Sequence, residues 1–212
     1  MTEPREIEAK FEIADPTPLL ELAQAPPLDV DGRTEIAQVD TYLDTADAAL
    51  KSSGSTLRLR ETNGVWTLTF KGARAAMAHG QRHVASRVEV NERVDVGVAR
   101  TILSGRRSAG RLAPLVLAAE ITRGGPLVQV ARIQTQRTAI DLIDPEGRRF
   151  ELAIDRCRGE RLADGRVIEF SEIELEARDP DPAALVTAAR ALRAAVPGLQ
   201  PSGQTKLARV LG

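Results

Sequence analysis

Strict alternation between apolar and charged residues is the feature that most constrains the fold of this chain. Over residues 5–13, Glu6, Glu8 and Lys10 share one face, and apolar side chains such as Ile7 and Ala9 occupy the other. A repeat of two residues is the period of a β-strand, whereas a helical pattern repeats about every 3.6 residues. The pattern therefore predicts a sheet with one apolar face and one charged face.

The same alternation recurs in later segments. Their polar positions are Arg58, Arg60, Thr67, Thr69, Lys71, Arg87, Glu89, Glu172, Glu174 and Glu176. For any one strand, the simplest interpretation is a charged face that meets water. Three glutamates in register repel one another, however, and solubility does not require them. Glutamates on some strands and arginine pairs on others favour a closed sheet whose charged interior holds a charged ligand together with metal ions.

The residue types on this face suit phosphate chemistry. Two glutamates at positions i and i+2 of one strand point into the same space, and a second pair on a facing strand completes an all-oxygen site. Hard cations such as Mg²⁺ and Mn²⁺ prefer such a site. Arg58 and Arg60 offer bidentate donors to phosphate oxygens, and Lys10 and Lys71 offer point charges. Phosphoryl transfer needs mainly positioning and charge neutralisation, which these groups supply.

The remaining patterns indicate a mainly antiparallel β protein, because hairpin turns such as Asn63-Gly64 dominate. The expected strands cover residues 5–13, 35–43, 56–61, 65–71, 83–91, 128–142, 148–155 and 166–177. Helices are expected over residues 16–23, 98–103, 181–195 and 204–211, the third capped by Asp181. Residues 106–126 contain an apolar stretch to which the pattern assigns no element.

Composition limits the classes of function. The chain has 212 residues and a formal net charge of −1, which argues against non-specific binding of nucleic acid. No apolar run approaches the roughly 20 residues of a membrane span, and the charged N-terminal residues do not resemble a signal peptide. We therefore expect a cytoplasmic protein with neither membrane nor nucleic-acid partners. Cys157 is the only cysteine, and His79 and His83 are too few for a His-based zinc site.

The lysines are unusually few. Of 29 basic residues only Lys10, Lys51, Lys71 and Lys206 are lysines. A chain so rich in arginine can use arginine wherever only positive charge is needed. A retained lysine is therefore suspected of serving a site that needs a compact ammonium group.

Several motifs occur in an order that is specific as a set. They are Glu6-x-Glu8-x-Lys10, Gln38-Val-Asp40-Thr-Tyr42-Leu-Asp44-Thr45, Leu57-Arg58-Leu-Arg60, Trp66-Thr-Leu-Thr69-Phe-Lys71-Gly72, Arg87-Val-Glu89, Thr135-Gln-Arg137-Thr, Glu172-Ile-Glu174-Leu-Glu176 and Lys206. The ordered set resembles the CYTH superfamily, the triphosphate tunnel metalloenzymes, and in particular the bacterial CYTH-type inorganic triphosphatases. Three of the four lysines fall on its motif positions.

The resemblance implies an α+β fold, an eight-stranded antiparallel β-barrel or tunnel with helices packed outside. One domain would span residues 1–212, either alone or as the N-terminal part of a longer CYTH–CHAD protein. The implied metal ligands are Glu6, Glu8, Glu172 and Glu174. The implied phosphate contacts are Lys10, Arg58, Arg60, Lys71, Arg87, Arg137 and Lys206. The implied catalytic groups are Glu8, Lys10, Lys71 and Glu89, with Asp155 and Glu176 as secondary candidates.

Two positions depart from the family pattern. Asn91 stands where many relatives have an acid, which would weaken a second metal site. Gln136 stands beside Arg137 where some relatives have a second arginine, which would alter the grip on one end of the ligand.

The expected activity is hydrolysis of a triphosphate with Mg²⁺ or Mn²⁺ as cofactor, most simply of inorganic triphosphate to diphosphate and phosphate. The alternatives are a thiamine triphosphatase or a class IV-type adenylate cyclase. From another class, a polyphosphate-binding module without turnover also fits the residues. The partner is in each case a triphosphate or polyphosphate ligand, and both a monomer and a homodimer are compatible with the sequence.

Overall fold

The strands of the protein join one antiparallel sheet. The computed structural model describes residues 5–22, 24–25, 27–73, 75–76, 84–105, 111–179 and 181–212. The strands are β1 (Arg5–Glu12), β2 (Gln24–Ala25), β3 (Leu28–Asp44), β4 (Thr56–Thr62), β5 (Val65–Lys71), β6 (Ala75–Ala76), β7 (Val84–Val94), β8 (Val128–Ile143), β9 (Arg149–Arg161), β10 (Arg166–Ala177) and β11 (Gln200–Pro201). The helices are α1 (Thr17–Leu20), α2 (Ala49–Ser52), α3 (Val96–Leu103), α4 (Ala113–Thr122), α5 (Pro182–Ala195) and α6 (Lys206–Leu211).

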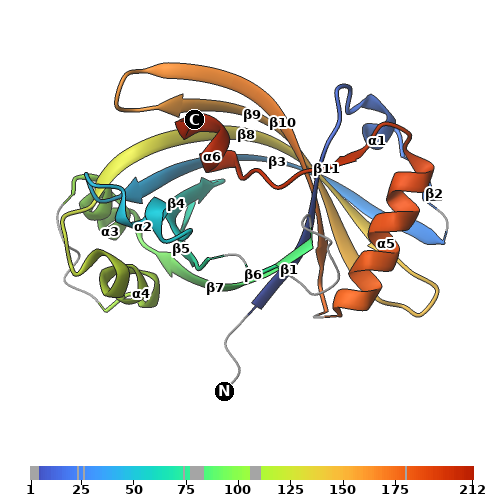
Figure 1. The fold of residues 1–212 in the computed structure, drawn as a ribbon, viewed down its shortest axis with the longest axis horizontal. Helices are drawn as coiled ribbons and strands as arrows, with labels where there is room; N and C mark the ends of the chain where they lie inside the picture. The colour runs from blue at the N-terminus through green and yellow to red at the C-terminus, as the bar shows by residue number, and fades with distance from the viewer. Residues whose placement is uncertain are drawn as a thin grey trace.

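Eight of the described strands close into a ring. Their order is β1–β10–β9–β8–β3–β4–β5–β7, and β7 pairs back with β1. Glu6 lies opposite Arg87 in the closing pair. Figure 1 shows β3, β8, β9 and β10 arching over one side of this ring, with β4, β5 and β7 on the other. The expected eight-stranded antiparallel tunnel fold is confirmed.

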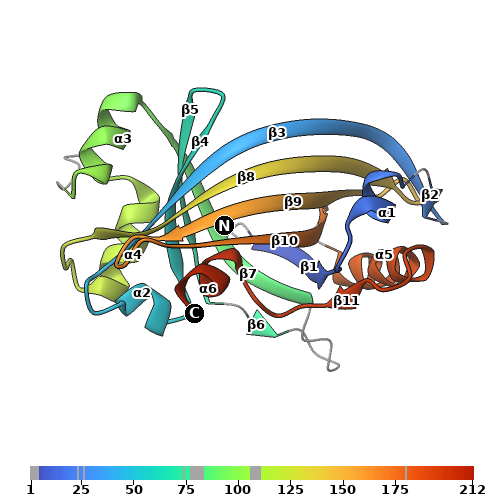
Figure 2. The same ribbon diagram turned by 90° about the horizontal axis from the view of Figure 1, so that it is seen from above.

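The alternation read from the sequence separates the two faces of the ring. On β1, Ala9 and Phe11 are fully buried in an apolar cluster that α1 and α5 cover. Leu57 and Leu68, from β4 and β5, lie in a second cluster that α2, α3 and α4 cover. Figure 2 shows these two groups of helices at opposite ends of the long strands. The apolar face is therefore the outer face, and the charged face lines the interior.

Local signals account for several of the elements. Asn63 and Gly64 both have positive φ angles, 51° and 78°, as the tight turn between β4 and β5 requires. The Asp181 side chain accepts hydrogen bonds from the backbone N–H groups of Ala183 and Ala184, so it caps α5 as expected. No helix in the described part of the chain has the length and apolar character to cross a membrane.

Some boundaries differ from those that the pattern predicts. Strand β3 begins at residue 28 rather than 35, and β9 continues to residue 161 rather than 155. Both extensions pair with β8, so tertiary hydrogen bonding prolongs them beyond their local signals. The apolar stretch left unassigned forms α4. His79 and His83 lie outside the described residues.

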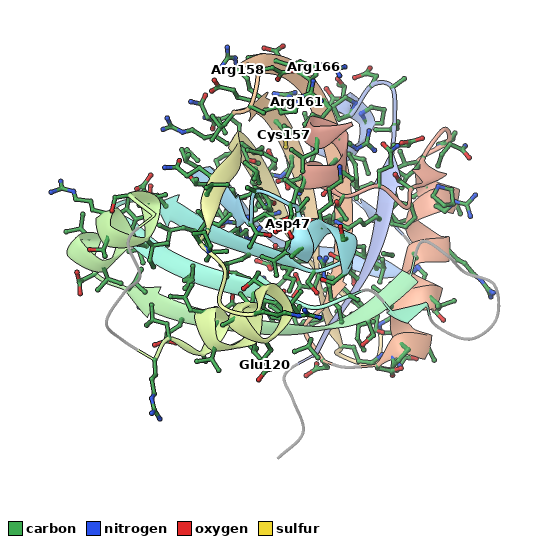
Figure 3. All side chains as sticks on the ribbon, turned by 60° about the vertical axis from the view of Figure 1, so that its left-hand side comes forward. Asp47, Glu120, Cys157, Arg158, Arg161 and Arg166 are labelled. Atoms are coloured by element: carbon green, nitrogen blue, oxygen red, sulfur yellow. The ribbon has the colours of Figure 1, made fainter. Side chains whose placement is uncertain are left out.

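The last helix, α6, packs against the inner face. Leu207 and Val210 lie in a cluster with Ile133 and Cys157, which share the face of the interior charged residues. Gly159 of β9 makes this packing possible, because a Cβ atom there would lie only 2.3 Å from Cγ2 of Val210. Arg161 donates a 3.0 Å hydrogen bond to the carbonyl of Leu211. In Figure 3, Cys157 and Arg161 lie near one another at the top of the view.

Candidate functional site

A cavity of about 380 Å³ lies inside the ring. Its described lining includes eight basic side chains, Lys10, Arg58, Arg60, Lys71, Arg87, Arg137, Arg178 and Lys206. It also includes five acidic side chains, Glu89, Glu151, Glu172, Glu174 and Glu176. A larger groove of about 900 Å³ near Asn63 and Arg156 has only two basic side chains in its described lining. The interior cavity is therefore the better anion site.

Two lysines and two glutamates form the centre of this cavity. Lys10 Nζ lies 3.1 Å from Glu172 Oε1 and also donates to Glu174. Lys206 Nζ lies 2.6 Å from Glu172 Oε1 and 3.3 Å from Glu174 Oε2. Lys10, Glu172 and Lys206 are all nearly inaccessible to solvent. Glu172 and Glu174, two of the three glutamates that alternate along β10, thus contact ammonium groups from β1 and α6, which offsets their mutual repulsion.

These contacts keep Lys10 and Glu174 charged. Burial lowers the pKa of Lys10, but the carboxylates of Glu174, Glu8 and Glu172 outweigh that effect and raise it above the ordinary value. Burial likewise raises the pKa of Glu174, but Lys10 and Lys206 hold it well below the ordinary value. Neither side chain is therefore positioned to exchange a proton with a ligand near neutral pH.

A buried aspartate holds the two arginines of β4. Asp40 of β3 is fully inaccessible and lies opposite Arg60 in the strand register. Arg60 donates to it from Nε at 2.7 Å and from Nη2 at 2.8 Å, and Arg58 Nη1 lies 3.5 Å away. Burial raises the pKa of Asp40, but Arg58 and Arg60 lower it to about 2 overall.

A second buried aspartate holds Arg137 on the neighbouring wall. Asp155 of β9 accepts hydrogen bonds from Nε and Nη2 of Arg137 at 2.8 and 2.7 Å. Lys206 Nζ lies 2.9 Å from the same carboxylate. Arg137 Nη1 also lies 3.4 Å from Glu151 Oε1, and Glu151 accepts a hydrogen bond from Arg178 through its other oxygen. Asp155 therefore faces the interior and ties β8, β9 and α6 together.

The wall formed by β5 and β7 carries a chain of polar contacts. Lys71 Nζ lies 2.7 Å from Glu89 Oε2. Asn91 donates to Glu89 at 3.0 Å and accepts from Thr69 at 2.6 Å. Asn91 thus orients Glu89 by hydrogen bonding. On the adjacent β1–β7 seam, Arg87 Nη2 lies 2.9 Å from Glu8 Oε1.

The oxygen atoms of this site suit a hard divalent cation. Oε2 of Glu172 is buried, and no hydrogen-bond donor reaches it from the described residues. Such an oxygen needs a cation, a donor or water to offset its burial. Among the described side chains, however, no three acidic, cysteine or histidine groups converge closely enough to enclose a metal by themselves. A cation would therefore share Glu172 and Glu174 with the two lysines.

Comparison with known proteins identifies the family. The sequence profile of the CYTH domain matches residues 4–211. The chain belongs to the CYTH family. A search of curated proteins finds no significant match.

Solved structures support the CYTH fold. A Bacillus halodurans protein provisionally called an adenylate cyclase matches with a TM-score of 0.67 and 20% identity, over 100% of both chains. A Hippeastrum protein provisionally called an adenylyl cyclase, and reported to have a dominant triphosphatase activity, matches with a TM-score of 0.64 and 22% identity. That match covers 97% of this chain and 95% of the other. Protein PH1819 of Pyrococcus horikoshii matches with a TM-score of 0.58 and 16% identity, over 97% and 98% of the two chains.

The structure brings together the phosphate contacts expected of a CYTH protein. Every one of them, Lys10, Arg58, Arg60, Lys71, Arg87, Arg137 and Lys206, lines the interior cavity. The cavity lining also includes Glu89, Glu172 and Glu174. Glu8 is buried, and its Oε2 atom lies 3.6 Å from Lys10 Nζ. The side chain of Glu6 lies outside the described residues. The roles of these residues remain predictions.

Other site residues were not assigned a role from sequence. Asp40 contacts Arg60, and Glu151 contacts Arg137. Glu151 and Arg178 also line the cavity. Asp40 and Glu151 each occupy the charged face of a strand whose alternate residues are mainly apolar. The two-residue alternation, which assigns every second residue of a strand to the same face, could therefore have identified them. Arg178 follows the end of β10, where alternation gives no signal.

The two departures from the family pattern have different consequences. Asn91 lies in the cavity wall, bonded to Glu89. Gln136 is exposed, and strand alternation places it on the face opposite Arg137. The expectation that Gln136 alters the grip on the ligand is therefore wrong.

Proposed function

We propose that this CYTH protein is a divalent-metal-dependent phosphohydrolase that cleaves inorganic triphosphate to diphosphate and phosphate. The observation that supports this most is the convergence of eight basic side chains on one cavity of about 380 Å³. That volume is near the lower end of the roughly 300–1,000 Å³ typical of small-molecule pockets. A linear anion of three phosphates matches such a small and strongly charged space.

The cationic groups have distinct parts in this proposal. Arg58, Arg60 and Arg137 present planar guanidinium groups to phosphoryl oxygens, and Lys10, Lys71 and Lys206 neutralise charge as it develops. A divalent cation held by Glu172 and Glu174, with Glu8 and Glu6 of β1 as the other expected ligands, would neutralise further charge on the phosphoryl oxygens.

Water is the proposed nucleophile. Glu89 is held by Lys71 and Asn91, so its carboxylate is fixed in the cavity wall and can orient that water. Water adds to the terminal phosphorus, the bridging P–O bond breaks, and diphosphate leaves with the bonding electrons.

An adenylate cyclase is the second candidate, because the Bacillus halodurans and Hippeastrum neighbours carry that provisional name. The cavity gives less support to a substrate with an organic base. Among its described lining residues Tyr42 is the one aromatic, and Tyr42 is itself buried in an apolar cluster. This argument also disfavours thiamine triphosphate.

One panel of assays tests the proposal. Phosphate and diphosphate release would be measured with Mg²⁺ and with Mn²⁺ on inorganic triphosphate, thiamine triphosphate, ATP and long-chain polyphosphate. We expect the highest kcat/KM on inorganic triphosphate and none in EDTA. Cyclic AMP formation from ATP would favour the second candidate, and binding of polyphosphate without turnover would favour a binding module.

A further inference from the structure

Asp40 is a fully buried carboxylate that contacts two residues of the proposed substrate site. It lies behind Arg58 and Arg60, whose side chains are 14% and 19% exposed. Oδ1 accepts from Arg60 Nε, and Oδ2 accepts from Arg60 Nη2 and Arg58 Nη1. Both carboxylate oxygens are thus directed at guanidinium groups.

Stability of the fold alone does not explain this arrangement. Burying a carboxylate costs several kcal/mol, and a buried ion pair often stabilises a fold no better than apolar side chains of the same volume. The positions around Asp40 offer an apolar alternative, since Ile133 of β8 lies directly opposite it in the register. Retention of the charged group therefore points to a role in the site.

The geometry suits positioning of the arginines. Arg58 and Arg60 lie two residues apart on one strand face and repel each other. One carboxylate shared between them offsets that repulsion but leaves a net positive charge on the triad. The two hydrogen bonds to Arg60 use two of its five N–H donors and fix the plane of its guanidinium group.

We propose that Asp40 is a positioning residue that fixes Arg58 and Arg60 for the transition state of triphosphate cleavage, and that it does not ligate the metal. This inference rests on the proposed function. Asp40 acts through the arginines, so its contribution depends on their presence. Loss of its negative charge makes the cavity more positive, so binding of the ground-state anion is preserved while the geometry needed for reaction is lost.

The test is a double-mutant cycle with Asp40→Asn and the Arg58→Ala/Arg60→Ala pair. In the otherwise wild-type protein, Asp40→Asn should lower kcat about 10- to 100-fold and leave KM within about threefold, because misplaced groups impair reaction more than binding. In the Arg58→Ala/Arg60→Ala background the same substitution should change kcat less than about twofold. The half-saturating Mg²⁺ concentration should be unchanged by Asp40→Asn.

Asp44 supplies a matched control on the same strand. It is also buried, but its oxygens accept from the backbone N–H groups of Thr45, Leu50 and Lys51. Asp44→Asn should lower the melting temperature and leave kcat per folded molecule unchanged. If it reduces kcat as much as Asp40→Asn does, or if the Asp40→Asn effect persists without the arginines, the inference is wrong. A shift in Mg²⁺ dependence would instead make Asp40 part of a metal site and would also overturn it.

A binding measurement separates this inference from the proposed function. Inorganic triphosphate titrated calorimetrically in EDTA should bind Asp40→Asn at least as tightly as wild type, and Arg60→Ala more weakly. Weaker binding by both variants would contradict the inference. If wild type binds but hydrolyses none of the phosphate compounds, the proposed hydrolase function fails and positioning for its transition state fails with it. A different result would reject the positioning role and leave the hydrolase function standing. Wild type would hydrolyse triphosphate, but Asp40→Asn would lower kcat equally with and without the two arginines.

Discussion

The Nζ atom of Lys206 lies 2.6 Å from Oε1 of Glu172, which joins the C-terminal helix to a strand 34 residues earlier in the chain. The contact depends on α6 lying against the inner face of the sheet, where Lys206 also reaches Asp155. It places a flexible cationic side chain among the carboxylates expected to hold metal. The ion pair therefore links the stability of α6 to the chemistry of the site.

The first prediction concerns Glu172→Gln. The sequence pattern alone suggests that removing one of three glutamates in register relieves repulsion. The structure reverses this expectation, because Glu172 contacts two buried ammonium groups. We expect the substitution to abolish triphosphate hydrolysis at ordinary Mg²⁺ concentrations and to lower the free energy of unfolding in EDTA by about 3 kcal/mol. Urea denaturation followed by circular dichroism measures this change. Glu169→Gln, on an exposed position of the same strand, should change it by less than about 0.5 kcal/mol.

The second prediction separates interior from exterior arginines. Arg58→Ala and Arg60→Ala should each cost roughly 2–4 kcal/mol of transition-state stabilisation, judged from kcat/KM on inorganic triphosphate. Arg33 and Arg193 are exposed and donate to backbone carbonyls of Leu20 and Leu199, so Arg33→Ala and Arg193→Ala should leave kcat/KM nearly unchanged. Comparable losses in the two sets would contradict the assignment of the interior face.

The third prediction concerns the few lysines. Lys10, Lys71 and Lys206 all line the cavity, whereas Lys51 is exposed on α2. A guanidinium group is larger and planar, so Lys→Arg at the three interior positions should lower kcat/KM despite the conserved charge. The crowding is greatest at Lys10 and Lys206, whose side chains are 3% and 6% exposed, so we expect at least a tenfold loss there. Lys51→Arg is the control. Near-wild-type rates for the three interior variants would show that the scarcity of lysine has no functional cause.

The sequence predicted the fold and most of the residues that line the interior cavity, because both depend on the two-residue alternation along each strand. In β1, for example, one two-residue repeat separates Glu8 and Lys10 from Ala9 and Phe11, and the ring then brings the charged face of every strand into one cavity. The alternation also separates Asp155 from the apolar Ile154, although hydrogen bonding beyond the local pattern prolongs the strand that carries it. What the alternation cannot predict is pairing across the cavity. The contact of Lys206 with Glu172 depends on where a six-residue helix docks, and that docking depends on the absence of a Cβ atom at Gly159.

The fourth prediction tests the docking of α6. Gly159→Ala would place a Cβ atom about 2.3 Å from Cγ2 of Val210, so the helix must shift or the side chain must move. Because Lys206 and Thr205 at the start of α6 line the cavity, the shift should lower kcat/KM as well as stability, the latter by roughly 1–3 kcal/mol. Val210→Ala in the same chain removes the colliding methyl groups. The double variant should therefore recover much of the lost kcat/KM, and failure to recover it would show that Gly159 matters for another reason.

The fifth prediction follows from the pKa of Asp40, which the neighbouring arginines depress to about 2 despite burial. A carboxylate whose pKa is lower in the folded protein than in the unfolded chain stabilises the fold above its unfolded pKa, about 3.9, and loses that contribution as pH falls toward the folded pKa. Asp40→Asn should therefore lower the free energy of unfolding by roughly 2–3 kcal/mol at pH 7. The difference between wild type and variant should be constant above about pH 5 and shrink as pH falls from about 4 toward 2. Urea denaturation at a series of pH values measures it. In the Arg58→Ala/Arg60→Ala background the pH dependence should reverse, because burial without the arginines raises the pKa of Asp40, so its ionisation disfavours folding as pH rises. A difference that still shrinks as pH falls from about 4 toward 2 in that background would assign the effect to other charges.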